Sequence, residues 1–582
     1  MIIEKHQKVR RRASLHLSLS RSMHKARKNY ILKSIEATGL SFCRETSIHG
    51  CRFLVEEIDK TGNTYVRRFR RAASILVWVP AVTFGSAFAI YLMILVWNRY
   101  QTTPTITTIE TNNYPIWNVP FPGVTICNVN SVYEPNTHNI SLELLKRGFT
   151  PAGIESFFQS LAALVNFREV DSAFGRIFQA LEDLGYSMEK LMFDMAQPCE
   201  NLIRECVWLG KTVPCKSLFR LVKSARGFCC SFNYKALRSS LEIETKADDY
   251  FQINTPVIRI SGAGEDVGLI LLVNVEEEYY VAPKRQFYGT EIIIHDAEDF
   301  PEQTLISAYG QPGDEVSIAV VPSVVVTEES AENLPTSLRF CRFSNEKPLR
   351  ITKKYSFQSC LTECRADSIL KRCGCLPFFF PELSYNQSMR SRQCSLKDIK
   401  CLSDNKHYFN SLQPSGDIGY DFNNTNLNIS DSSVGMSCDC LPSCSEQVYN
   451  IQTFITKLFN DTSADYGHFD TYNSSANSTI IKVYFKDLSC IKYRREIFMT
   501  WDDMLASFGG IFGLCLGGSV LSLVEIAYYA TFKLYARILA NKAKLEEEQN
   551  HPHLLLNFNK VRFSPVSRQK KSKSPYQEAF LW

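Results

Sequence analysis

Two long apolar segments interrupt an otherwise mixed pattern of hydrophobic and polar positions along the chain. Residues 72–98 carry no charged side chain, and residues 504–532 carry only one, Glu525. About 20 apolar residues are enough to cross the hydrocarbon layer of a bilayer as a helix, so each segment is predicted to span a membrane. The first is too long and lies too far from the N-terminus to be a secretory signal. A buried helix of a soluble protein is the alternative, which the length of both segments disfavours.

The distribution of charge predicts how these two helices are oriented. Residues 1–71 hold 17 basic and 6 acidic side chains, and residues 533–582 hold 10 and 4. The stretch between them, residues 72–532, is acidic, with 38 basic and 50 acidic side chains. Because basic residues accumulate on the cytoplasmic side of a membrane, both termini are expected in the cytoplasm. Residues 99–503 are then expected outside the cell, in a multi-pass protein of the plasma membrane.

Glycosylation sequons and cysteines support this topology. All seven sequons lie between the two apolar segments, and they begin at Asn139, Asn386, Asn423, Asn428, Asn460, Asn473 and Asn477. Seventeen of the 20 cysteines also lie there, where an oxidising exterior would pair them. Cys43 and Cys51 are expected to be cytosolic thiols, and Cys515 lies within the second apolar segment.

The region between the two segments has the pattern of a mixed α+β domain. Residues 141–195 have helical apolar spacing, whereas residues 257–326 contain short β-branched runs separated by glycine, proline and acidic turns. Residues 355–371 return to helical spacing, and residues 403–435, rich in Asn, Ser and Asp, are expected to form a solvated loop. The predicted fold is therefore a membrane protein with two transmembrane helices flanking a large, disulfide-rich α+β extracellular domain.

The second apolar segment contains a stripe of small residues. Gly509, Gly513 and Gly517 recur every four residues, which by itself suits close packing between membrane helices. The adjacent glycines 517 and 518 predict a break in the helix. A broken backbone at membrane depth is tolerated only where it lines water or lies buried in protein.

A polar stripe follows the glycines. Ser519, Ser522 and Glu525 are spaced three residues apart, which keeps them near one side of a helix. An acidic residue inside a membrane indicates an ion pathway, and rings of carbonyl and carboxylate oxygens select cations in channels. The combination favours a pore lined by Ser522 and Glu525 over a helix that only packs.

Four motifs follow one another along the chain. His49-Gly50 precedes the first apolar segment, and Phe121-Pro-Gly-Val-Thr-Ile-Cys127-Asn follows it. Gly517-Gly518-Ser519 interrupts the second apolar segment. Before it runs a mirrored series of cysteines, Cys360-x3-Cys364, Cys373-x-Cys375, Cys394, Cys401 and Cys438-x-Cys440-x3-Cys444. In this combination the chain resembles the degenerin/epithelial sodium channel superfamily, and most of all its insect pickpocket branch, over about residues 45–535.

This resemblance implies which residues carry function. The implied selectivity filter is Gly517, Gly518 and Ser519, and the implied gating residues are His49, Gly50 and Ala506. By the same resemblance the chain assembles in the lipid bilayer as a homo- or heterotrimer with related subunits. It is expected to conduct sodium ions and to be blocked by amiloride-type compounds. A sensory role is expected. The sequence does not identify the chemical or mechanical stimulus that opens the channel.

The resemblance also implies a disulfide pairing. The implied pairs are Cys341 with Cys444, Cys360 with Cys440, Cys364 with Cys438, Cys373 with Cys401 and Cys375 with Cys394. Three more pairs are expected among Cys127, Cys199, Cys206, Cys215, Cys229 and Cys230. Of these pairs, Cys206 with Cys215 is the easiest to predict, and Cys127 is expected to pair with Cys229 or Cys230. Cys490 is left without a partner in this scheme.

Other classes of protein fit the sequence less well. A two-span receptor or adhesion protein shares the sequons and the cysteines, but it has no use for a costly carboxylate in the membrane. A channel of the purinergic-receptor type shares the topology, although its cysteine pattern is not recognisable here. An enzyme is disfavoured because the sequence has no nucleophile elbow, phosphate loop or metal-ligand spacing. No cofactor, metal or nucleic-acid partner is expected.

Overall fold

The computed structural model divides the chain into two compact units. The described residues are 31–55, 64–102, 105–170, 174–236, 256–302, 305–383, 391–413, 435–458 and 478–550. Met1–Gln101 and Met499–Trp582 form one unit, called here the helical unit, and Thr102–Phe498 form the other, called the disulfide-bonded unit. The helical unit contains both segments predicted to span a membrane.

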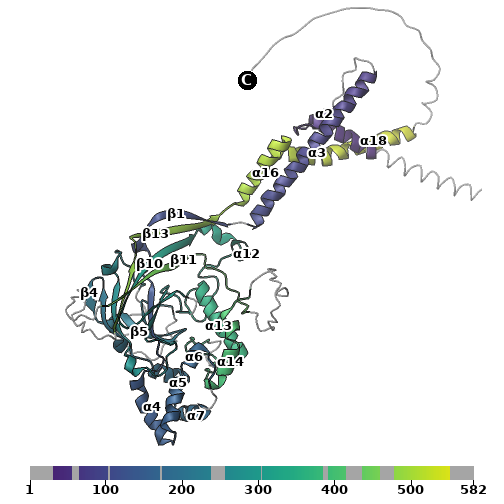
Figure 1. Ribbon diagram of the computed structural model, residues 1–582. Helices are drawn as coiled ribbons and strands as arrows, with labels where there is room; N and C mark the ends of the chain where they lie inside the picture. The colour runs from purple at the N-terminus through teal and green to yellow at the C-terminus, as the bar shows by residue number, and fades with distance from the viewer. Residues whose placement is uncertain are drawn as a thin grey trace, which may run out of the picture. The chain divides into compact units, whose positions relative to one another are not determined.

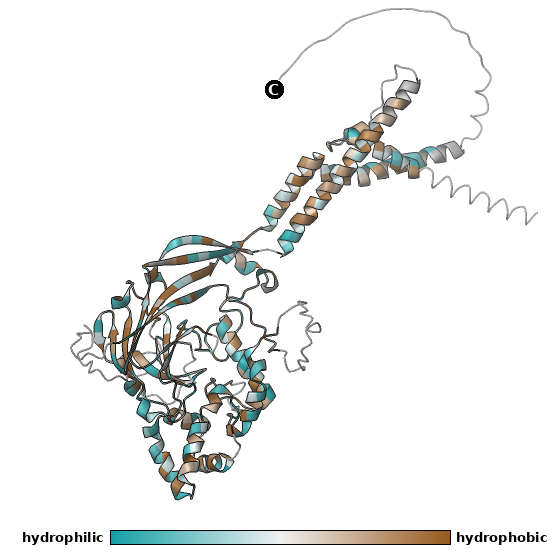
Figure 2. Ribbon diagram, in the orientation of Figure 1, coloured by the Kyte–Doolittle hydropathy of each residue, from teal (hydrophilic) through white to brown (hydrophobic). Residues whose placement is uncertain are grey.

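The first apolar segment of the helical unit is one uninterrupted helix. α3 (Thr64–Thr102) passes through Pro80 without a break, and its part Ala72–Thr102 is long and apolar enough to cross a membrane. Hydrophobic residues cover most of its length in Figure 2. A helix over residues 31–45 and the short α2 (Cys51–Val55) precede α3 in the chain.

The second apolar segment is a broken helix (Figure 1). Its parts are α16 (Trp501–Leu516), α17 (Val520–Tyr528), a π-helical turn (Tyr529–Lys533) and α18 (Leu534–Asn550). Trp501–Leu516 and Val520–Lys544 meet at an angle of 71°, and only together are they long and apolar enough for a membrane segment, which is either one broken span or a re-entrant loop. Thr500 begins α16 with a capping box, in which Thr500 Oγ1 accepts from Asp503 N and the Asp503 carboxylate accepts from Thr500 N. The predicted break at the paired glycines is confirmed.

Two β-sheets form the centre of the disulfide-bonded unit. The larger has the order β1-β13-β10-β12-β7-β3-β4, with β11 also paired to β10. Its strands are β1 (Thr105–Pro115), β3 (Ile203–Trp208), β4 (Lys211–Val213), β7 (Leu269–Asn274), β10 (Asp314–Thr327), β11 (Glu446–Lys457), β12 (Ser478–Phe485) and β13 (Ser489–Ile497). The smaller has the order β5-β6-β2-β8-β9, formed by β2 (Gly123–Asn128), β5 (Phe219–Ser224), β6 (Gly227–Phe232), β8 (Thr290–His295) and β9 (Ser307–Gly310).

Phe121 joins the two sheets. Its ring is fully buried and makes edge-to-face contacts with Phe232 of the smaller sheet and with Trp208 and Phe485 of the larger one. Asn233 fixes the backbone there by donating from Nδ2 to Phe121 O at 2.6 Å. The Phe-Pro-Gly motif that follows the first apolar segment is therefore part of the hydrophobic core.

Short helices form a second hydrophobic core next to the sheets. Their bounds are α4 (Glu134–Lys146), α5 (Pro151–Ser160), α6 (Ala163–Asn166), α7 (Gly175–Asp183), α8 (Met188–Asp194), α13 (Phe357–Cys373), α14 (Ile399–Asp404) and α15 (Lys406–Asn410). Phe157, Leu181, Phe379 and Phe409 are among its fully buried members. The helical spacing over 141–195 is confirmed as several helices. The strand pattern over 257–326 is confirmed from residue 269 on as β7 to β10, whereas near its start Arg259 forms only an isolated bridge with Pro120.

The predicted solvated loop at 403–435 begins too early. Residues up to Asp404 belong to α14, and Lys406–Asn410 form α15, because Leu402 and Phe409 are buried in the second core. Residues 414–434 lie outside the described part of the chain. Of the seven sequons, Asn139 is on the exposed side of α4, and the other six lie outside the described residues.

Eight disulfides cross-link the disulfide-bonded unit. The pairs are Cys127–Cys229, Cys199–Cys230, Cys206–Cys215, Cys341–Cys444, Cys360–Cys440, Cys364–Cys438, Cys373–Cys401 and Cys375–Cys394. The last five pairs are those that the family resemblance implies. Cys127 takes Cys229 of its two expected partners, and Cys490 is a buried free thiol.

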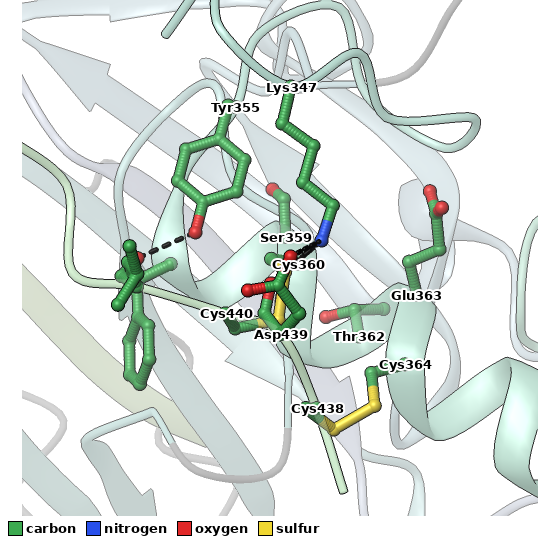
Figure 3. The surroundings of a disulfide bond; sticks show 12 residues. Lys347, Tyr355, Ser359, Cys360, Thr362, Glu363, Cys364, Cys438, Asp439 and Cys440 are labelled. Atoms are coloured by element: carbon green, nitrogen blue, oxygen red, sulfur yellow. Dashed lines mark hydrogen bonds and ion pairs between the residues drawn. A yellow bond between two sulfur atoms is a disulfide. The ribbon is translucent and has the colours of Figure 1, made fainter. Parts of the chain in front are cut away.

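Two of these disulfides lie one helical turn apart (Figure 3). Cys360 and Cys364 are four residues apart on α13 and therefore share one side of the helix, opposite Cys440 and Cys438. The Lys347 ammonium donates to Asp439 O at 2.7 Å, which holds the backbone between the two bonds. This arrangement explains why the cysteine order in the sequence is mirrored.

Candidate functional site

The candidate site is the break in the second apolar segment. Gly517 ends α16 in the left-handed conformation, with φ +64°, which would cost an L side chain roughly 1–2 kcal/mol. Its N–H donates to Gly513 O at 2.8 Å and so closes the helix end. After Gly518, Ser519 N donates to Ser522 Oγ at 3.0 Å at the start of α17. Gly517 to Ser519 therefore form a non-helical turn between two apolar helices.

His49 contacts this turn, and Gly50 packs against α3. His49 N donates to Leu516 O at 2.8 Å, the carbonyl at the end of α16. A Cβ added to Gly517 would lie 2.5 Å from the His49 ring. Gly50, with φ +85°, fits equally closely, because a Cβ there would lie 2.5 Å from Val82 of α3. The family resemblance implies a gating role for His49-Gly50 and a selectivity role for Gly517-Gly518-Ser519. The structure brings these two motifs into direct contact.

The polar side of α17 faces the residues that precede His49. Ser522 is fully buried, and its Oγ lies 2.9 Å from Ser47 Oγ. Thr46 Oγ1 donates to the half-buried Glu525 carboxylate at 3.2 Å. The stripe predicted from a three-residue spacing is thus real, and it meets a segment about 475 residues away in the chain. The pore-lining role of Ser522 and Glu525 stays a prediction.

Known proteins that resemble this chain cover both halves of the site. Residues 42–529 match the model of a family described as amiloride-sensitive sodium channel. The chain belongs to this family. It is 26% identical over 536 residues to sodium channel protein Nach of Drosophila melanogaster, covering 88% of this chain and 90% of that protein. It is 22% identical over 558 residues to pickpocket protein 28 of Drosophila melanogaster, covering 89% and 82%.

A human protein also resembles this amiloride-sensitive sodium channel family member. The bile acid-sensitive ion channel of Homo sapiens is 25% identical over 519 residues, which is 85% of this chain and 86% of that protein. The resemblance to the degenerin/epithelial sodium channel superfamily and its pickpocket branch is therefore confirmed. Members of the family are membrane-embedded ion channels.

Ala506 lies on a face of α16 that no described residue covers. It is exposed, and no described side chain or distant backbone approaches within 4 Å of a Cβ built on Gly509 or Gly510. Gly517 at the other end of the same helix is tightly covered by His49. Within the described residues, the glycine stripe is therefore covered at Gly517 and uncovered at Gly509.

A second set of contacts lies beyond the break, and no pattern in the sequence predicted it. Glu45 accepts a hydrogen bond from Tyr529 of the π-helical turn and forms an ion pair with Lys533 at 3.0 Å. Further along α18, Arg537 donates to Ser41 Oγ at 3.1 Å. The helix over residues 31–45 is thereby attached to the end of the channel's second apolar segment. Isolated polar positions so far apart carry no periodic signal that could have revealed these pairs.

Proposed function

We propose that the chain is one subunit of a trimeric, sodium-selective channel that amiloride-type compounds block. The observation that carries the proposal is the non-helical turn Gly517 to Ser519, set between two apolar helices and contacted by His49. Unpaired backbone groups are unstable in hydrocarbon, so such a turn belongs beside water or protein. Three copies around one axis, as a homo- or heterotrimer, would bring three turns together at a narrow point of a pore.

The proposed filter is formed by Gly517, Gly518 and Ser519. Carbonyl and hydroxyl oxygens at a break can replace part of the hydration shell of a sodium ion, which a continuous helix cannot offer because its carbonyls are bonded. Ser522 and Glu525 continue the pathway on the α17 side, where the carboxylate attracts cations. His49 holds the turn from the side and Gly50 packs the same segment against α3, so that a movement of this segment would change the filter or the gate.

The proposed topology has α3 and the bent α16–α17 pair as two membrane spans. Both termini are then cytoplasmic and the disulfide-bonded unit extracellular, in agreement with the two basic terminal segments and the seven sequons between them. Endoglycosidase is expected to increase the mobility of the surface protein on a gel. Epitope tags at both termini are expected to bind antibody only after cells are permeabilised. A terminal tag that stains intact cells would contradict this topology.

The selectivity of the turn can be tested by recording currents from cells that express the chain. Ser519→Cys is expected to change the reversal potential between sodium and potassium solutions. Ser507→Cys is the matched control, because Ser507 lies on α16 and its hydroxyl donates to Asp503 O of its own helix at 2.8 Å. Equal reversal potentials in the wild type and in variants at all three filter positions would place the filter elsewhere.

The proposed role is sensory, with an unidentified chemical or mechanical stimulus. The stimulus is sought by expressing the chain alone and together with related subunits, and by recording currents during each stimulus with and without amiloride. An amiloride-blocked inward sodium current that one stimulus evokes would support the proposal. A surface-expressed trimer that stays silent under all stimuli and in activating variants would favour a two-span receptor instead.

A further inference from the structure

A cavity in the disulfide-bonded unit is lined by residues that take no part in the candidate site. It has a volume of about 650 Å³ and opens between the start of α7 and the turn Leu396–Asp398, which leads into α14. Cavities that bind small molecules usually have volumes of about 300–1,000 Å³ and mostly apolar walls. The size of this cavity is therefore that of a binding site for a small organic molecule.

The floor of the cavity belongs to the hydrophobic core. Phe178 and Ile399 are 8% and 3% exposed and are members of the helical core of this unit. Phe174 and Leu396 are half-buried and extend the apolar wall toward the opening. Because these side chains already pack against the helical core, the apolar wall exists without a ligand, and binding would require little rearrangement.

Two lysines lie at the opening. Lys397 Nζ lies 6.0 Å from the centroid of the Phe178 ring, and both Lys397 and Lys400 are exposed. Among the described residues, neither lysine has a recorded ion pair. The neighbouring Asp398 is engaged elsewhere, since it forms a bidentate ion pair with Arg392 at 2.8 Å. The described lining thus holds two basic side chains, Lys397 and Lys400, and one acidic side chain, Glu169.

We propose that this cavity binds an organic anion with an apolar body, such as a carboxylated or sulfonated amphiphile. The apolar body would cover Phe174, Phe178 and Leu396, which removes their exposed surface from water. The anionic group would lie between Lys397 and Lys400, at the edge of a region of low dielectric where an ion pair is stronger than in open water. A neutral molecule of the same shape would lose this attraction, and a cationic one would be repelled.

The test uses a diazirine-bearing long-chain carboxylate as a photoaffinity probe on the full-length protein at the cell surface. Mass spectrometry is expected to find the label on peptides that contain Phe174 or Leu396. Excess dodecanoate is expected to reduce labelling at least fivefold, and dodecyltrimethylammonium is expected to have no such effect. The readout requires no current, so its result is independent of the proposed channel function.

Three variants sharpen the test. The double variant Lys397→Glu with Lys400→Glu is expected to reduce labelling at least fivefold. Lys190→Glu is the matched control, because Lys190 is also exposed and lies 5.1 Å from the ring centroid of Tyr186, outside the cavity. Gly175→Leu is expected to fill the opening, because a Cβ there would contact the Lys397 stem at 3.6 Å.

The outcome separates the proposal from unspecific adsorption. Reduced labelling in the double variant and in Gly175→Leu, with wild-type labelling in Lys190→Glu, supports an anion site at this cavity. Labelling that is equal in all variants, or that the cationic amphiphile competes equally well, overturns it. Label found only on α3 or α16 also overturns it, because the probe would then have entered the lipid-facing helices instead.

Discussion

The disulfide-bonded unit and the helical unit keep their shapes by different means. The described part of the first has eight disulfides and two large hydrophobic cores. The described part of the second has no disulfide, and its cysteines at 43, 51 and 515 are free. The contacts at its helix break are a few single hydrogen bonds from residues 46–49. Elements that switch are drawn from regions of low local stability, so we expect changes to damage folding in the first unit and gating in the second.

The largest expected effect is the loss of a disulfide. Cys364 and Cys438 are 74 residues apart, and a bond that closes such a loop contributes about 4 kcal/mol in the chain-entropy model. Cys364→Ser is therefore expected to reduce the amount of protein at the cell surface several-fold, and Cys438→Ser added to it is expected to do little further harm. Cys51→Ser, at a free thiol of the helical unit, is the control. Peptide mapping under non-reducing conditions that joins Cys364 to another cysteine would contradict the pairing.

The next effect concerns gating and is expected at Ala506. In the proposed trimer, a closed pore requires close approach of three helices, which Ala allows and a bulky side chain prevents. Overpacking of a tight contact costs about 1–3 kcal/mol, and if only the closed state bears this cost, the open:closed ratio rises roughly 5- to 150-fold. Ala506→Val and Ala506→Phe are therefore expected to give a standing inward sodium current without a stimulus, which amiloride blocks.

Ala506→Gly is the control for this prediction, because it adds no bulk, and it is expected to stay silent. The exposure of Ala506 in the single chain also allows the alternative that it faces lipid. A Val or Phe variant that reaches the surface in normal amounts and carries no standing current would favour that alternative.

A smaller effect is expected where Ser47 meets Ser522. One buried hydrogen bond contributes about 0.5–1.5 kcal/mol, and a double-mutant cycle isolates it from the other contact of Ser522, with Ser519 N. On an Ala506→Val background, Ser47→Ala and Ser522→Ala are each expected to change the open fraction in single-channel recordings. The double variant is expected to change the open:closed ratio by a factor smaller than the product of the two single-variant factors. Ser507→Ala, which loses only a bond within α16, is the control. Independent effects of the two variants would show that this contact does not take part in gating.

In the disulfide-bonded unit, the stability of the fold is expected to depend on pH. Burial and the neighbouring Asp299 carboxyl raise the pKa of Asp296 to about 7. Since this folded-state pKa lies above that of an exposed aspartate, stability is greatest in acid and is lost as pH rises toward and through about 7. Asp296→Asn is therefore expected to raise the unfolding temperature of the full-length protein at pH 8, and to raise it less at pH 5. Glu278→Gln, at an exposed carboxylate, is the control, and a gain that is equal at both pH values would contradict the prediction.

The sequence predicted best those features that a local pattern determines. Length and hydropathy located α3, the glycine pair located the helix break, and helical spacing located α13 within two residues of its bounds. The end of the second apolar segment was harder to place. The predicted segment ends at Phe532, just before the basic Lys533, but backbone hydrogen bonding continues through the π-helical turn into α18, past Lys533.

Contacts between distant residues could not be predicted from local patterns. The strands β1, β12 and β13 join the larger sheet from opposite ends of the unit, and nothing in their short sequences specifies their partners. The contact of His49 with Gly517 depends on two backbone conformations and on the packing of Gly50 against Val82. Each of these is a property of the folded chain, so the sequence could identify the residues of the site but not their contacts.

The smallest expected effect is electrostatic and concerns Glu525. Its carboxylate accepts a hydrogen bond from Thr46 Oγ1, and a glutamine amide oxygen can accept the same bond, so Glu525→Gln removes the charge and leaves the contact. If the charge concentrates cations near the pathway, the variant conducts less. The difference is expected to be larger at about 0.01 M salt, where charges act over about 30 Å, than at about 0.1 M, where screening limits them to about 10 Å.

Thr46→Val is the complementary control, because it removes the hydrogen bond and keeps the charge, and its conductance ratio to wild type is expected to be independent of salt. A salt-dependent loss in Thr46→Val but not in Glu525→Gln would show that Glu525 acts through the position of the segment before His49 and not through its charge.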